Sequence, residues 1–148
     1  MKFMVQVRAN EDTEAGYFPP NASEMFAAMD RFNQGLIRDG WMLGGDGLQP
    51  SSKAKRIRMA GSKRTVVDGP FAETKELVAG YWIWQVRSLD EAVEWARRCP
   101  APMPGEEGVL EIRPFFEAED FGKEYTPELR ERDERLRQEI ERQQKSQA

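Results

Sequence analysis

One strand-like run, residues 78–86, constrains the fold of this 148-residue chain more than any other segment. Successive side chains of a β-strand point to opposite faces of the sheet. In this run both faces are apolar, one through Val78, Trp82, Trp84 and Val86, and the other through Ala79, Tyr81 and Ile83. A strand that is apolar on both faces needs a cover on each side. The run therefore predicts a central strand with helices over one face and a second copy of the chain over the other.

Two helices are predicted in the first hundred residues. The segment 10–20 is polar and predicts a loop. A capping box of Asn21 and Glu24, or Ser23 as an alternative cap, predicts the start of a helix that ends at Gly40. This helix carries an apolar stripe at helical spacing, made of Met25, Met29, Phe32 and Leu36. A second capping box at 88–91 opens a helix that Pro100 ends. The inward side of the second helix is predicted to be Leu89, Ala92, Val93, Ala96 and Cys99.

The predicted strands complete a recognisable order. Besides the central strand, strands are expected at 2–8, 41–43 and 109–115, and a hairpin is expected at 55–67. A glycine-rich segment at 44–47 interrupts the second strand, and a Pro/Gly-rich loop at 100–108 precedes the last one. The order strand, helix, strand, hairpin, strand, helix, strand is the split β-α-β layout of ferredoxin-like α+β domains, with an inserted β-hairpin. Both helices would then cover one face of the sheet, and we expect a homodimer that covers the other.

The last part of the chain has a different composition. Thr126 and Pro127 form a helix start, and almost every later residue is charged or Gln. Only Leu129, Leu136 and Ile140 form a thin apolar stripe. We therefore expect a folded domain over residues 1–122 and a charged helical extension over 123–148, either solvated or placed along a partner subunit.

Composition excludes several classes of protein. A net charge of −4 and a pI near 5.1 argue against a nucleic-acid binder, and no apolar run is long enough to span a membrane. The chain has no histidine and a single cysteine, Cys99, so neither an internal disulfide nor a zinc site is expected. These features favour a cytoplasmic protein without a metal or other cofactor.

The loop 68–76 holds the densest group of ionisable residues that could act chemically. A carboxylate on a stiff loop against an apolar wall can serve as an acid or a base, so Asp68 and Glu73 are the candidate catalytic pair. Asp68 can equally be a turn residue whose side chain accepts backbone N–H groups. Lys75 can hold an anionic group of a substrate or be solvated with Glu76.

Further ligand contacts are expected around this loop. The candidate ligand-binding residues are Pro70, Phe71, Lys75, Tyr81, Glu111 and Arg113. Glu111 and Arg113 share one face of the last strand, which is either solvent-exposed or turned toward the inside of a dimer. Arg113 would suit a small anionic molecule because its planar guanidinium matches a carboxylate. A basic hairpin, with Lys and Arg at 53, 55, 56, 58, 63 and 64, is expected to be a charge-protected edge.

The chain resembles the DGPF branch of the YCII-related proteins. The resemblance covers about residues 1–122 and rests on four matches, Asp68-Gly69-Pro70-Phe71 with Glu73 and Lys75-Glu76, Met1-Lys2-Phe3-Met4, Leu43-Gly44-Gly45 with Gly47-Leu48, and Glu111-Ile112-Arg113-Pro114. It implies a dimeric α/β barrel in a bacterial, mostly uncharacterised family. Other YCII-related proteins carry a His-Asp pair that is proposed as an active site. Of that pair, only the aspartate can be transferred to this chain, at Asp68.

Two kinds of function follow from these observations. The first is a dimeric barrel with a small-molecule pocket at the Asp-Gly-Pro-Phe loop, which is enzyme-like or only binds its ligand. The alternative is a regulatory or protein-interaction module. The resemblance implies a link to sigma-factor systems for this alternative, because some relatives are encoded beside such factors or fused to them.

Overall fold

A computed structural model describes residues 1–101 and 107–148. The chain divides into two compact units, Met1–Phe115 and Phe116–Ala148. The first unit contains β1 (Lys2–Arg8), α1 (Glu11–Ala15), α2 (Ala22–Arg38), β2 (Met42–Gly47), β3 (Lys55–Ala60), β4 (Lys63–Asp68), β5 (Val78–Gln85), α3 (Leu89–Ala96) and β6 (Leu110–Pro114), with 3₁₀ turns η1 (Ser51–Lys53) and η2 (Thr74–Glu76). The second contains a 3₁₀ turn, η3 (Ala118–Phe121), and α4 (Pro127–Gln147).

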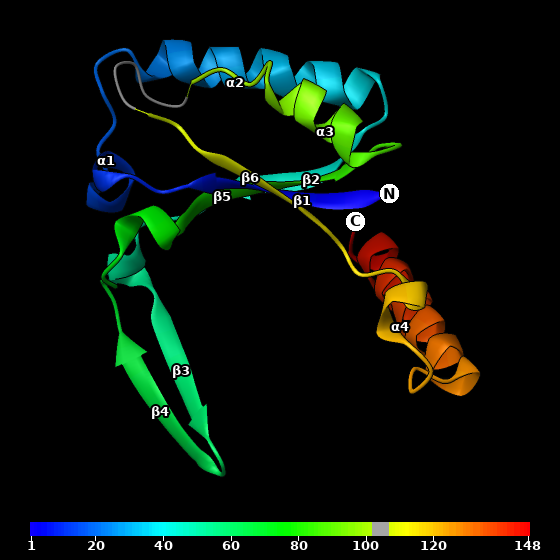
Figure 1. Ribbon diagram of the computed structural model, residues 1–148. Helices are drawn as coiled ribbons and strands as arrows, with labels where there is room; N and C mark the ends of the chain where they lie inside the picture. The colour runs from blue at the N-terminus through cyan, green and yellow to red at the C-terminus, as the bar shows by residue number, and fades with distance from the viewer. Residues whose placement is uncertain (102–106) are drawn as a thin grey trace. The chain divides into compact units, whose positions relative to one another are not determined.

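A four-stranded antiparallel sheet organises the first unit. Its strand order is β2-β5-β1-β6, so β5 is a central strand. Helices α2 and α3 lie over one face of this sheet (Figure 1). The chain is thus a mixed α/β protein with antiparallel sheets and a C-terminal helix.

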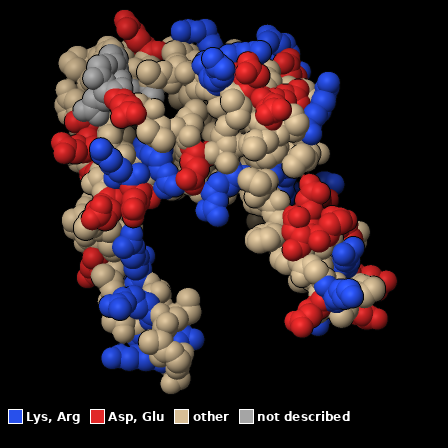
Figure 2. All heavy atoms as spheres, in the orientation of Figure 1, with Lys and Arg blue, Asp and Glu red and all other residues tan. Residues whose placement is uncertain are grey.

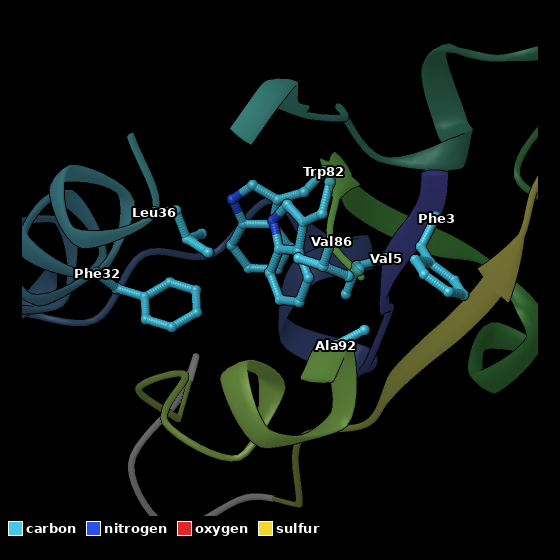
Figure 3. Packing of buried hydrophobic residues seen from close by; sticks show 8 residues of the cluster. Phe3, Val5, Phe32, Leu36, Trp82, Val86 and Ala92 are labelled. Carbon is cyan, nitrogen blue, oxygen red and sulfur yellow. The ribbon is translucent and has the colours of Figure 1, made fainter. Parts of the chain in front are cut away.

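The core lies between the sheet and the two helices. Phe3 of β1 is opposite Trp84 of β5, and Val5 is opposite Trp82. All four side chains are buried and pack against Phe32 and Leu36 of α2 and Ala92 of α3 (Figure 3). The Trp82 indole N–H donates to Asn33 Oδ1 at 2.8 Å, so this large side chain is buried without leaving its donor unpaired.

The opposite face of the sheet, called the open face below, carries the alternate residues of the same strands. Its half-buried members are Met4, Gln6, Tyr81, Ile83 and Glu111, and Arg113 is exposed. The apolar residues of β5 that point to this face therefore lack the deep burial of Trp82 and Trp84.

Several expectations about the helices are wrong in detail. The segment 10–20 contains α1, which Asn10 begins through a capping box with Thr13; a five-residue helix is too short to show an apolar period. Asn21 makes no side-chain cap bond, because its backbone is not extended. In α3, Leu89 and Val93 are 46% and 39% exposed. The residues of α3 that face the core are Ala92, Trp95 and Ala96, and Cys99, just after the helix, also packs against the core.

The glycine-rich segment after α2 belongs to a strand, whereas an interruption was expected. β2 runs through it to Gly47, with a register shift between Met42 and Gly44. A Cβ on Gly45 would lie only 2.7 Å from the Tyr81 carbonyl oxygen, so glycine lets β2 approach β5 closely.

The hairpin of β3 and β4 is a separate two-stranded sheet, confirmed within a residue of its expected bounds. Nearly all of its side chains are exposed. Lysine and arginine side chains gather on it in Figure 2.

The second unit contains the expected charged helix. Thr126 Oγ1 accepts from the Leu129 N–H at 3.4 Å, and Pro127 occupies the first turn. An Arg142–Glu139 pair at 2.7 Å is one of the contacts between neighbouring turns. The Tyr125 hydroxyl donates to Asp133, and this bond raises the pKa of Tyr125. No helix in the described ranges is both long and apolar enough to cross a membrane.

Candidate functional site

The loop 68–76 is fixed against the chain that follows β2. Its Gly69 N–H donates to the Ala54 carbonyl oxygen at 3.0 Å, and the Gly69-Pro70 peptide bond is cis. A Cβ at Gly69 would lie 1.7 Å from the Ser51 carbonyl oxygen. Only glycine fits this close approach, so the glycine of the Asp-Gly-Pro-Phe motif has a steric role.

Ser51 connects this loop to the first helix. It is 7% exposed and is a buried polar residue of the described chain. Its hydroxyl oxygen accepts from the Phe71 N–H at 3.1 Å and its hydroxyl donates to the Glu14 carboxylate. Its backbone N–H also donates to Glu14 Oε1 at 3.0 Å. Because the donors and acceptors are matched, α1, η1 and the loop are held in one arrangement.

A cavity of about 550 Å³ lies beside this bridge and is called the DGPF pocket below. Its lining includes Glu14, Ser51, Lys53, Arg56 and Phe71, together with apolar residues such as Leu77 and Val78. The Arg56 guanidinium lies 3.8 Å from the centre of the Phe71 ring. This cation–π contact holds the guanidinium at the edge of the pocket.

The charges of the DGPF pocket favour an anion. Within the described residues, neither Lys53 nor Arg56 forms an ion pair. The carboxylate of Glu14 already accepts two hydrogen bonds from Ser51. Two cations are thus free to meet a ligand, whereas the single acidic group is occupied.

The proposed acid–base residues lie outside this pocket. The Asp68 side chain is 74% exposed and pairs with Lys55 Nζ at 2.5 Å across the hairpin. Glu73, Lys75 and Glu76 are exposed as well, and Glu73 has a left-handed backbone with φ of 61°. The loop therefore turns both candidate carboxylates, Asp68 and Glu73, toward solvent.

The remaining predicted residues divide between the pocket and the sheet. Phe71 lines the DGPF pocket, while Pro70 is exposed. Tyr81 of β5 and Glu111 of β6 are paired with Gln6 on the two sides of β1, and Arg113 of β6 is paired with Met4. These side chains therefore lie on the open face. Glu111 pairs there with Arg8 at 2.9 Å.

Sequence reasoning did not identify Glu14, Ser51 or Arg56 as site residues. Glu14 lies in a segment expected to be a loop, and Ser51 has no motif around it. Arg56 was noticed only as part of the basic hairpin. Across the described chain, no group of three or more Cys, Asp or Glu side chains is arranged to hold a metal ion.

The first unit is a small mixed α/β domain with antiparallel sheets. A family model of the YCII-related domain matches residues 1–118, and the chain belongs to that family. Over 68 residues it is 40% identical to an uncharacterized protein of Rhizobium meliloti (strain 1021), covering 46% of this chain and 54% of the relative. The chain thus spans about half the length of this curated relative.

One solved structure is also similar. It is the 5-chloro-2-hydroxyhydroquinone dehydrochlorinase of Burkholderia phenoliruptrix AC1100 in complex with 2,5-dihydroxybenzoquinone, at 13% identity and a TM-score of 0.41. The match covers 80% of this chain and 98% of the dehydrochlorinase. The activity and the ligand in this name are those of the Burkholderia protein.

Proposed function

We propose that this chain is a YCII-related protein of the DGPF branch that binds a small anionic molecule in the DGPF pocket. The observation that carries the proposal is the Ser51 bridge, in which one buried hydroxyl contacts both Glu14 and Phe71. Such a bridge fixes a pocket before its ligand arrives, and preorganisation reduces the entropic cost of binding. Lys53 and Arg56 supply the positive charge.

A comparison of two arginine variants tests this proposal. Thermal unfolding would be followed with a panel of small carboxylates and phosphate esters, first on the native chain and then on Arg56→Gln. Arg58→Gln is the matched control, because Arg58 is an exposed residue of the same strand and does not line the pocket. We expect one or more anions to stabilise the native chain and Arg58→Gln, and to lose most of that effect in Arg56→Gln. Equal stabilisation of all three proteins would contradict the proposal.

An enzymatic role for Asp68 and Glu73 remains a proposal of its own. In it, the two carboxylates act as acid and base on a ligand whose anionic group is held near Arg56. Asp68→Asn should then abolish turnover of the molecule that the panel identifies and leave its binding intact. Unchanged turnover would reduce the function to ligand binding.

We further propose a ferredoxin-like subunit that dimerises into an α/β barrel. The strand order β2-β5-β1-β6 with two helices on one face supports this topology. The half-buried Met4, Tyr81 and Ile83 of the open face support a second copy as its cover. In such a dimer Glu111 and Arg113 would line the interface. A cytoplasmic location is a prediction that rests on the single cysteine.

A regulatory interaction is the second candidate function, and α4 is the feature that favours it. Its apolar residues Leu129, Leu136 and Ile140 are 38%, 61% and 53% exposed. Removing residues 126–148 should then remove partner proteins from a pull-down with the dimer intact. An unchanged set of partners would reject this function.

A further inference from the structure

A second and larger cavity lies next to the DGPF pocket. Its volume is about 730 Å³, within the range of roughly 300–1,000 Å³ that is typical of small-molecule sites. Its walls come from residues 13–18, helix α2, the loop 47–53, Ala79 of β5 and residues 100–101. We call it the apolar cavity, because most of its lining side chains are apolar.

Aromatic side chains around the apolar cavity are poorly covered. Tyr17, Phe18 and Phe26 are 51%, 67% and 58% exposed. The rings of Phe18 and Phe26 form an edge-to-face pair with centroids 5.6 Å apart. Clustered exposed aromatics around a cavity mark a binding surface, since each ring would gain burial from an apolar ligand. Met25 and Met29 complete this wall with flexible side chains that adapt to a ligand's shape.

One charged side chain lies in the described lining of the apolar cavity. Lys53 is the cation among its lining residues, and the described lining contains no carboxylate. Around Lys53 lie the polar side chains of Ser52 and Gln49. A ligand with a single negative charge would thus find a cation and hydrogen-bonding groups at one end and aromatic rings elsewhere. An amine would find no acidic partner among the described lining residues.

We propose that the apolar cavity binds an amphiphilic carboxylate, with the carboxylate at Lys53 and the apolar body between Phe26, Met29 and Ala79. The site is distinct from the DGPF pocket, although the loop 48–53 forms a wall of both. Phe26 lines only the apolar cavity and Arg56 only the DGPF pocket. The two sites can therefore be tested separately.

The test is calorimetric titration of the full chain with decanoate, with decanol and decylamine as probes of the same chain length. Decanoate should bind more tightly than both. Phe26→Ala should weaken decanoate binding about tenfold through lost apolar contact. Ile37→Ala, which removes an exposed apolar side chain from the same helix, should leave it unchanged. Lys53→Gln should weaken it by up to about fivefold, the upper end of the range for an exposed ion pair, and Lys63→Gln on the hairpin should have no effect.

A second variant keeps the test decisive. Ala79→Leu adds volume inside the apolar cavity without removing a contact, so it should abolish decanoate binding. No binding of decanoate, or equal binding of decylamine, would overturn the proposal. If Arg56→Gln weakens decanoate binding as much as Phe26→Ala does, the proposal is also overturned, because the ligand would then occupy the DGPF pocket. That last result would leave the proposed function standing.

Discussion

At Ser51, a side chain that is almost fully buried meets hydrogen-bonding groups of two distant segments. Its partners are the Glu14 carboxylate and the Phe71 N–H, and its own N–H is also paired. A hydrogen bond between such buried groups adds only about 1 kcal/mol to the free energy of unfolding. Removing one partner costs more, because the other polar group then stays buried without a hydrogen bond. The position of the DGPF loop thus depends on one hydroxyl.

Removing this hydroxyl should destabilise the protein. In Ser51→Ala the Phe71 N–H loses its acceptor and the Glu14 carboxylate loses a donor, so we expect the free energy of unfolding to fall by about 1–3 kcal/mol. Ser52→Ala is the matched control, because Ser52 is exposed and makes no side-chain hydrogen bond in the described structure. Denaturant unfolding of both variants measures the difference. Equal stability of the two variants would contradict the bridge.

Cys99 gives a prediction about pH. Burial raises the pKa of the Cys99 thiol to about 11, so the native thiol stays protonated when an unfolded thiol would ionise. The stability that the protonated thiol contributes is fully present below the pKa of the thiol in the unfolded chain, near 9. It is lost as the pH rises through the pKa of the thiol in the folded chain. Alkylation at pH 8.5 should therefore be much slower for the native chain than for the chain in denaturant.

A cysteine variant isolates this effect from other groups that titrate at high pH. From pH 9 to 11, the Cys99→Ala variant should lose less stability than the native chain. An identical pH dependence of the two proteins would show that Cys99 is not shielded.

At the scale of elements, helix α3 depends on the N-cap residue that precedes it, Ser88. Ser88 Oγ accepts from the Glu91 N–H at 3.1 Å, and the Glu91 carboxylate accepts from the Arg87 N–H at 2.8 Å. Ser88→Ala should cost about 1 kcal/mol of unfolding free energy, the usual value of an N-cap. Ser62→Ala in the exposed hairpin turn should cost almost nothing. Urea denaturation compares them, and equal midpoints would argue against the cap.

Elements with a local pattern could be predicted from the sequence. The alternation of Phe3, Val5 and Val7, the cap at Ser88 and the dense charge after Thr126 each identified an element that is present. Helix α1 could not be predicted because five residues are too few to show a helical period. The side of α3 that faces the core depends on Trp95, whose ring centre lies 6.2 Å from that of Phe32. Such a contact is tertiary and has no local pattern.

The candidate site was harder to predict for the same reason. The motif at Gly69 and Phe71 points to the loop, but the hydrogen bonds of that loop reach Ser51, 20 residues earlier, and those of Ser51 reach Glu14, 37 residues earlier. No spacing in the sequence brings these residues together. Ionisable density alone led instead to Asp68, which is exposed beside Lys55.

At the scale of the whole molecule, the open face of the sheet carries the dimer prediction. Ile83 lies near the middle of this face and is half-buried. Ile83→Glu should place a charge in the proposed interface and convert the dimer to monomers, because an unpaired buried charge is costly. Ile37→Glu adds the same charge at a residue of α2 that is 61% exposed and should leave the dimer intact. Sedimentation velocity of the native chain and both variants measures their oligomeric state. A native chain that sediments as a monomer would contradict the dimer.

Binding of a small anion in the DGPF pocket can be seen by diffraction from crystals soaked with the anion that stabilises the native chain most in thermal unfolding. We expect difference density beside Ser51, with the anionic group within hydrogen-bonding distance of Arg56 or Lys53. Density for the anion at another place on the molecule, or a pocket that stays empty at saturating anion, would contradict it.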